Sequence, residues 1–147
     1  MSLTQRLEQD MKAAMKNKDK AKLGVIRMLR SAIKNMEIER GRPLEEDEVL
    51  DVLARELKQR KESLQEFEKA GRSELAEKVK AEIAVVETYL PAPLSQEELR
   101  ELARQVIDEV GASTPADMGK VMKEIIPRVK GRADGKEVNR IVRQLLG

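Results

Sequence analysis

The chain has 147 residues, of which 40 % are apolar, so it is long enough to fold as one ordinary domain or two small ones around a real core. Charged residues reach 38 % but nearly cancel to a net charge of +2, which is typical of amphipathic helices with solvated outer faces. The absence of cysteine and histidine excludes disulfides, thiolate metal sites and Ser–His–Asp catalysis, and we expect no metal and no cofactor.

The N-terminal segment is charged within its first turns and contains no apolar region of the kind found in signal peptides. No window approaches the roughly 18 consecutive apolar residues that a membrane span requires. We therefore expect a cytoplasmic protein that does not enter a membrane.

Helical spacing recurs along the sequence and strand signals are almost absent, so we predict an all-α fold. A first helix is expected after Ser2, which forms a capping box with Gln5. The apolar stripe of this helix repeats every four residues and consists of Leu3, Leu7, Met11 and Met15. A second helix is expected to begin after Asp19 as its N-cap and to end at the "GRP" turn.

Two further helices complete the N-terminal part. The third begins in the acidic run 45–48, where carboxylates favour the positive end of the helix dipole, and the fourth is expected to be capped by Ser73. The stretch "YLPAPLS" follows, and two prolines in three residues cannot continue a helix. We therefore predict two helical bundles, one of about four helices over residues 1–91 and one of about three helices over residues 92–147.

Three helices are predicted in the second domain. Ser95 and Glu98 form a capping box at the start of the first one. Thr114 is the expected cap of the next helix, with Pro115 at its first helical position.

The stretch "KGRADGKE" before the last helix has the glycines and the lysine of a phosphate-binding P-loop. That motif requires four residues between its glycines and a hydroxyl after the lysine, whereas Gly131 and Gly135 are separated by three residues and Glu137 replaces the hydroxyl. A joint between two helices explains every residue, since Gly131 supplies a left-handed position and Asp134 caps the last helix in a box with Glu137. We predict this joint and not a nucleotide site.

Folding alone does not explain the positive charge of the last 30 residues, which include eight basic and three acidic side chains. Phosphate is the natural anion for such a cluster, because arginine binds it bidentately. The segment has no aromatic residue for base stacking, so an RNA would be recognised by its backbone and shape. The candidate nucleic-acid-binding residues are Lys120, Lys123, Arg128, Lys130, Arg132, Lys136, Arg140 and Arg143. A solvated charged face is the alternative interpretation.

A secondary basic patch is expected near the N-terminus, where residues 1–34 include nine basic and three acidic side chains. Its candidate residues are Lys16, Lys20, Arg27 and Arg30. The alternative is that Arg27 and Arg30 pair with acidic residues of the third helix across the bundle.

The segment "MGKVMKEIIPRVKGRADGKEVNRIVRQLL" resembles the C-terminal tail of the GatB subunit of tRNA-dependent amidotransferases. The whole chain, including "GVIRMLRSAIKNMEIERGRPLEEDEVLDVLARELKQRKES", resembles the free-standing YqeY proteins that share this tail. The resemblance implies two helical bundles, and it implies tRNA as the partner of Lys120, Lys123, Lys130, Arg132 and Lys136.

Family labels of this kind also carry an amidotransferase activity, a carbon–nitrogen ligation with glutamine as amido donor. The resemblance places the glutaminase and the ATP-dependent kinase site of that reaction outside the tail. The six serines of the chain are separated from one another and none lies in a glycine-rich setting. We therefore expect no amidotransferase activity from the isolated chain.

Two functions remain open at the level of the sequence. The first is a non-catalytic accessory module that binds tRNA or another structured RNA through the basic C-terminal helices. The second is a protein-interaction module that docks on an amidotransferase or an aminoacyl-tRNA synthetase, for which an apolar surplus at Met118, Val121, Met122, Ile125 and Ile126 provides support. An enzyme that uses carboxylates is the least favoured class.

Overall fold

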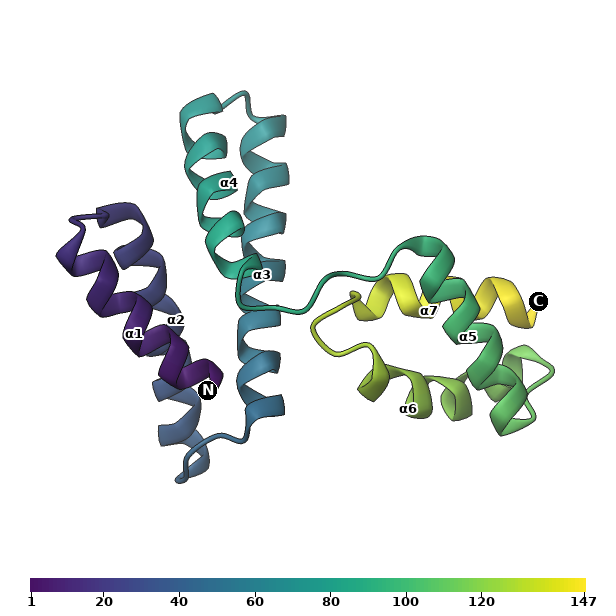
Figure 1. Ribbon diagram of the computed structural model, residues 1–147. Helices are drawn as coiled ribbons and strands as arrows, with labels where there is room; N and C mark the ends of the chain where they lie inside the picture. Colours follow the sequence, from purple (N-terminus) through teal and green to yellow (C-terminus); the bar gives the residue numbers. More distant parts are fainter. The chain divides into compact units, whose positions relative to one another are not determined.

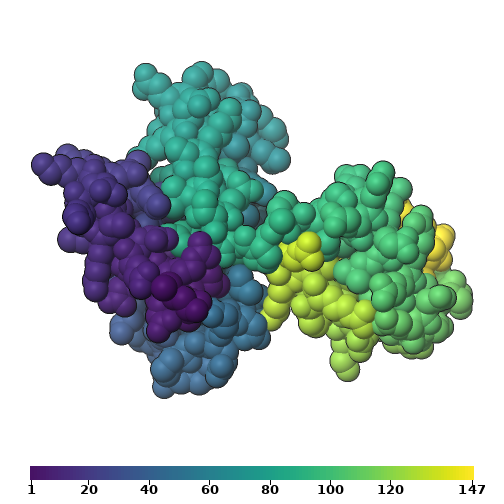
Figure 2. Space-filling model, in the orientation of Figure 1, coloured from purple at the N-terminus to yellow at the C-terminus, as the bar shows by residue number.

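The computed structural model describes all 147 residues, and it confirms the all-α prediction. The chain forms seven α-helices, one short 3-10 helix and no strand (Figure 1). It divides into two compact units, Met1–Pro91 and Ala92–Gly147. In the space-filling view the first unit is coloured purple to teal and the second green to yellow, and each is a closely packed body (Figure 2).

Two helical hairpins make up the first unit. Its helices are α1 (Leu3–Lys16), α2 (Lys20–Arg40), α3 (Glu46–Lys69) and α4 (Ser73–Glu87). The helix α1 packs along α2, α3 packs along α4, and α2 joins the hairpins by contacting both α3 and α4. Ten buried side chains fill the core, and all but one are aliphatic: Leu7, Val25, Ile26, Leu29, Ile33, Val49, Val52, Leu53, Val86 and Tyr89.

Local sequence signals set most helix ends of this unit. The predicted box is confirmed, since Ser2 accepts from the Gln5 N–H and the Gln5 side chain accepts from the Ser2 N–H. Asp19 is confirmed as the N-cap of α2 because it accepts from Lys22 N. The prediction that Ser73 caps α4 is wrong, because Ser73 is already helical and Arg72 is the N-cap without a side-chain hydrogen bond.

Burial departs from the predicted stripe at one position of α1. Leu7 is fully buried, but Met15 at the end of the same stripe is 51 % exposed. Met15 lies in the last turn of the helix, next to the turn into α2.

The second unit is a three-helix bundle in which every helix contacts both others. It contains α5 (Gln96–Val110), the 3-10 helix η1 (Pro115–Asp117), α6 (Met118–Arg128) and α7 (Gly135–Leu146). Its core is entirely aliphatic and consists of Leu99, Ala103, Val106, Val121, Ile125, Val129, Val138, Ile141, Val142 and Leu146.

The start of α6 differs from the prediction of a helix at Pro115. The capping box of Ser95 and Glu98 at α5 is confirmed, but Pro115 opens a 3-10 turn and α6 begins only at Met118. The Asp117 carboxylate accepts N–H bonds from Ser113 and Thr114, and these bonds hold the chain in the tighter turn. None of the helices combines the length and hydropathy needed to cross a membrane.

Candidate nucleic-acid interface

The most regular part of the basic cluster lies on α7. Lys136, Arg140 and Arg143 are exposed and occur at i, i+4 and i+7, so they share one face of the helix. The opposite face is buried and consists of Val138, Ile141, Val142 and Leu146. The amphipathic pattern therefore aligns three cations along the solvent side of α7, and we call these three residues the α7 basic row.

One member of the α7 basic row has an acidic partner. Arg140 donates from its Nε to Glu137 Oε2 at 3.2 Å and pairs with the same carboxylate through Nη2. This hydrogen bonding lowers the pKa of Glu137 and raises the pKa of Arg140. Only one side of the predicted capping box between Asp134 and Glu137 is present. Asp134 caps the helix by accepting from Lys136 N, but the Glu137 carboxylate accepts from Arg140 and from Gln96.

The other two members of the row have no acidic partner. Neither Lys136 nor Arg143 forms an ion pair. The last turn of α7 contains no acidic residue, which leaves the Arg143 guanidinium to solvent at the negative end of the helix dipole.

Lys120 and Lys123 are exposed on α6, one turn apart. Lys120 lies 4.0 Å from Asp117 Oδ1, at the limit of an ion pair, whereas Lys123 has none. The backbone N–H groups of Ser113 and Thr114 lower the pKa of Asp117, and the nearby Lys120 lowers it further.

Arg128 joins two helices of the bundle. Its Nη2 lies 2.6 Å from Glu109 Oε2 on α5 and 3.7 Å from Glu124 Oε2 on its own helix. The hydrogen bond lowers the pKa of Glu109 and raises that of Arg128. Two carboxylates already neutralise this guanidinium, so it is the least available of the candidate cations.

Arg132 closes the turn between α6 and α7 onto the segment that enters the unit. Its Nε donates to Ala92 O at 2.9 Å, and its own carbonyl accepts from Leu94 N at 2.9 Å. Gly131, with φ of 72°, supplies the left-handed residue that the sequence predicts for this turn. Lys130 is half-buried beside it.

The secondary basic patch is less coherent. Lys16 and Lys20 are exposed on either side of the α1–α2 turn, and Arg27 is exposed on α2. The alternative that Arg27 and Arg30 pair with acids of α3 is wrong, because neither forms an ion pair and Arg30 Nη1 donates to Met11 Sδ on α1 at 2.9 Å.

The acids of α3 and α4 have another partner, Arg60, which the sequence analysis missed. Arg60 is 6 % exposed and pairs with Glu56 at 2.8 Å and with Glu82 at 3.6 Å. The i, i+4 spacing of Glu56 and Arg60 was visible in the sequence, but such pairs are usually exposed. Only the packing of α2 and α4 on α3 buries this one.

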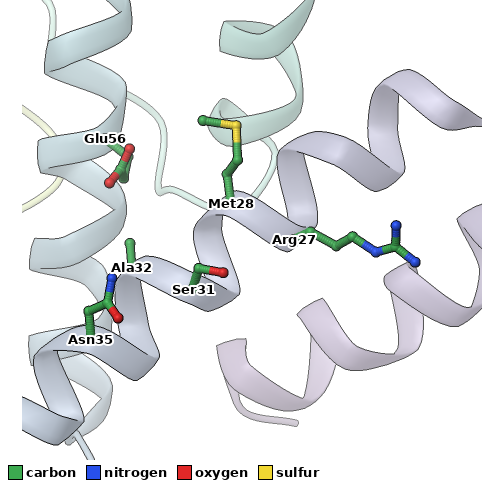
Figure 3. Close-up of a pocket in the computed structure, with 6 residues that line it drawn as sticks. All are labelled: Arg27, Met28, Ser31, Ala32, Asn35 and Glu56. Carbon is green, nitrogen blue, oxygen red and sulfur yellow. The ribbon is translucent and has the colours of Figure 1, made fainter.

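An open groove of about 320 Å³ lies between α2 and α3 (Figure 3). Its lining residues are Arg27, Met28, Ser31, Ala32, Asn35 and Glu56. Arg60 contacts two of these lining residues, Met28 and Glu56. Met28 and Glu56 border the groove from different helices, whereas Arg27 extends away from Glu56. No group of three or more acidic side chains is placed to hold a metal ion.

The apolar surplus of α6 belongs to the core. Val121 and Ile125 are fully buried, and Met118, Met122 and Ile126 pack partly buried against the same cluster. These side chains therefore contribute mainly to the packing of the second unit.

The family comparison covers nearly all of this fold. Residues 4–146 match the family described as Yqey-like protein. The chain belongs to the Yqey-like family. This membership agrees with the resemblance drawn from the sequence, and it spans both helical units.

Curated relatives carry the name "Altered inheritance of mitochondria protein 41, mitochondrial". The protein of Kluyveromyces lactis is 39 % identical over 75 % of this chain and 61 % of its own length. That of Lachancea thermotolerans is 36 % identical over 75 % of this chain and 60 % of its own length. That of Pyrenophora tritici-repentis is 29 % identical over 97 % of this chain and 80 % of its own length. The Yqey-like chain thus spans about three fifths of the first two relatives.

The expectation of a cytoplasmic protein is wrong in the light of these relatives, which are named as mitochondrial proteins. That expectation used the lack of an apolar signal-peptide region and of a membrane-spanning segment. Both features are shared by folded proteins of several aqueous compartments, so they do not distinguish one such compartment from another.

Proposed function

We propose that this Yqey-like chain is a non-catalytic RNA-binding accessory module that contacts the phosphate backbone of tRNA or another structured RNA. The observation that carries the proposal is the α7 basic row. Its three exposed cations are spaced about one helical turn apart, and two of them have no carboxylate partner. The resemblance to the GatB tail supports tRNA as the RNA of choice.

Backbone recognition suits the chemistry of this face. Guanidinium groups bind phosphate bidentately and lysine binds it as a point charge, so the row offers both kinds of contact. The second unit has no aromatic side chain on which a base could stack. Such a surface favours shape and charge over base sequence.

The ion pairs and hydrogen bonds show which candidate cations are already engaged within the fold and which can bind a phosphate. Arg128 is held by two carboxylates and Arg132 is engaged with a backbone carbonyl, so both contribute mainly to folding. Arg140 shares one exposed carboxylate, which a phosphate can replace because exposed pairs are weak. Lys123, Lys136 and Arg143 are available without breaking any pair.

The test is tRNA affinity measured across a salt series for the parent and for Lys136→Ala/Arg143→Ala. If both cations contact phosphate, the variant binds more weakly at low salt and the negative slope of log K against log salt becomes shallower by about two. The matched control is Arg55→Ala/Lys61→Ala, which removes the same two charges from exposed positions of α3. An unchanged slope in the α7 variant, or an equal loss in the control, rejects the proposal.

The apolar support for the protein-interaction alternative is weaker than expected, because two of the five α6 residues are fully buried and the other three pack partly buried against the same cluster. The alternative remains distinguishable by experiment. Capture of amidotransferase or synthetase proteins by the chain should disappear after nuclease treatment if RNA mediates it. Capture that survives the nuclease favours direct docking.

A further inference from the structure

The buried guanidinium of Arg60 has an incomplete set of hydrogen-bond partners. Its Nη1 donates to Glu56 Oε2 at 2.8 Å and to Glu56 O at 3.2 Å. Its Nε is buried without a hydrogen bond, and its Nη2 donates only to Met28 Sδ at 3.5 Å. A thioether is a weak acceptor, so a charged donor that is out of water remains poorly satisfied.

Met28 is accessible despite this contact with a buried group. The residue is 51 % exposed on α2 and borders the groove of about 320 Å³ that Figure 3 shows. Half of the residue is therefore open to a small oxidant in solution. The side chain thus combines a contact with a buried donor, through its sulfur, with exposure to solvent.

We propose that Met28 is an oxidation site at which conversion to the sulfoxide strengthens the contact between α2 and α3. The oxidant is hydrogen peroxide. The sulfur attacks one peroxide oxygen, an S–O bond forms as the O–O bond breaks, and the departing hydroxide takes the proton of the transferred oxygen and leaves as water. The sulfur loses two electrons, the peroxide is reduced, and the product is a polar sulfoxide.

The sulfoxide oxygen is a far better acceptor than the thioether for the Arg60 Nη2 donor. Oxidation of methionine normally weakens a fold because it places a polar group in an apolar environment. Met36, which packs partly buried against the core and accepts no hydrogen bond from an arginine, should follow that rule. Oxidation of Met28 should instead stabilise the fold, because the sulfoxide oxygen would accept a hydrogen bond from the buried Arg60 guanidinium.

Met15 provides a matched control. It is also 51 % exposed and lies in a helix of the same unit, but no arginine donates to its sulfur. Exposure alone therefore predicts the same oxidation rate and the same effect on stability for the two residues. Any difference in the effect on stability between them reports the Arg60 contact.

The first experiment treats the full chain with limited hydrogen peroxide and follows each methionine by peptide mass spectrometry. We expect both Met15 and Met28 to be oxidised in the folded protein. In a Met15→Leu background, amide hydrogen exchange in α2 and α3 should become slower after oxidation, and sulfoxide reductase should reverse the effect. Faster exchange, or a Met28 that stays reduced while Met15 is oxidised, overturns the proposal.

The second experiment needs no oxidant. Glutamine places a carbonyl oxygen near the position of the sulfoxide oxygen, whereas leucine offers no acceptor. We expect Met28→Gln to unfold about 4 °C higher than Met28→Leu. At the control position Met15→Gln should be no more stable than Met15→Leu, because leucine has the slightly higher helix propensity. An equal difference at the two positions overturns the proposal.

Discussion

Tyr89 Oη donates a hydrogen bond of 2.5 Å to Asp10 Oδ2 and thereby joins the end of α4 to α1. Arg6 lies on the same side of α1, with its guanidinium carbon 4.8 Å from the centre of the Tyr89 ring and its Nη2 3.1 Å from Thr88 O. The two helices share no other contact of comparable extent, since α1 packs mainly on α2. This small cluster therefore closes the first unit where its last helix ends.

Replacing Tyr89 with phenylalanine keeps the ring and removes the hydroxyl. The Asp10 carboxylate then loses a donor, and we expect the free energy of unfolding to fall by about 1–2 kcal/mol. Urea unfolding followed by far-ultraviolet circular dichroism measures this change. Asp10→Asn retains an acceptor and should cost less; a Tyr89→Phe protein with the parent's midpoint would show that the bond contributes nothing.

The same hydroxyl makes stability depend on alkaline pH. Burial, followed by the hydrogen bond and the charge of Asp10, raises the pKa of Tyr89 above its ordinary value of 10.0. Because the folded state holds the proton more tightly, this contribution is complete below pH 10 and decreases as the pH rises further. The stability advantage of the parent over Tyr89→Phe should thus be constant up to about pH 10 and shrink above it. An advantage that grows above pH 10 contradicts the assignment.

Removing Arg60 should be among the most damaging substitutions in the first unit. Arg60→Ala leaves Glu56 and Glu82 close together without their shared cation, and we expect a loss of about 3 kcal/mol. Glu82→Gln should cost less, because Glu56 still neutralises the guanidinium at 2.8 Å. Urea midpoints of the two variants test this order, and equal losses would mean that the Glu82 contact accounts for the whole contribution of Arg60.

The stability of the second unit should depend on its aliphatic core and not on its cations. Ile125→Ala removes a fully buried side chain and should cost about 2–5 kcal/mol. Lys136→Ala/Arg143→Ala should stay within about 0.5 kcal/mol of the parent, since both side chains are exposed and unpaired. Thermal unfolding of both proteins makes the comparison, which also establishes that any loss of RNA binding in the double variant is not a loss of folding.

The helices were predictable because their signals are local. The box at Ser2 and the left-handed Gly131 follow from residues within one turn of each other, and the periodic apolar stripe of the first helix includes Leu7, which is fully buried. Ser73 failed as a cap because helix starts shift by a residue when a neighbouring position can also begin the turn.

Pairing across helices was not predictable. The sequence shows which residues are charged, but Arg128 finds Glu109 and Arg60 finds Glu82 only after the helices pack. The same holds for Arg132, whose partner is a backbone carbonyl 40 residues away. The sequence therefore showed that basic residues are concentrated near the C-terminus. It could not show which of them form contacts within the fold and which have no partner.

Phe67 and Tyr89 both belong to the first unit, and the core of the second is made of aliphatic side chains alone. The second unit consequently contributes no aromatic absorbance in the near ultraviolet and no intrinsic fluorescence. Tyrosine fluorescence records the melting of Met1–Pro91 by itself, without any label. A single tryptophan placed on the exposed face of α7 would report the unfolding of the second unit separately, because the chain contains no other tryptophan.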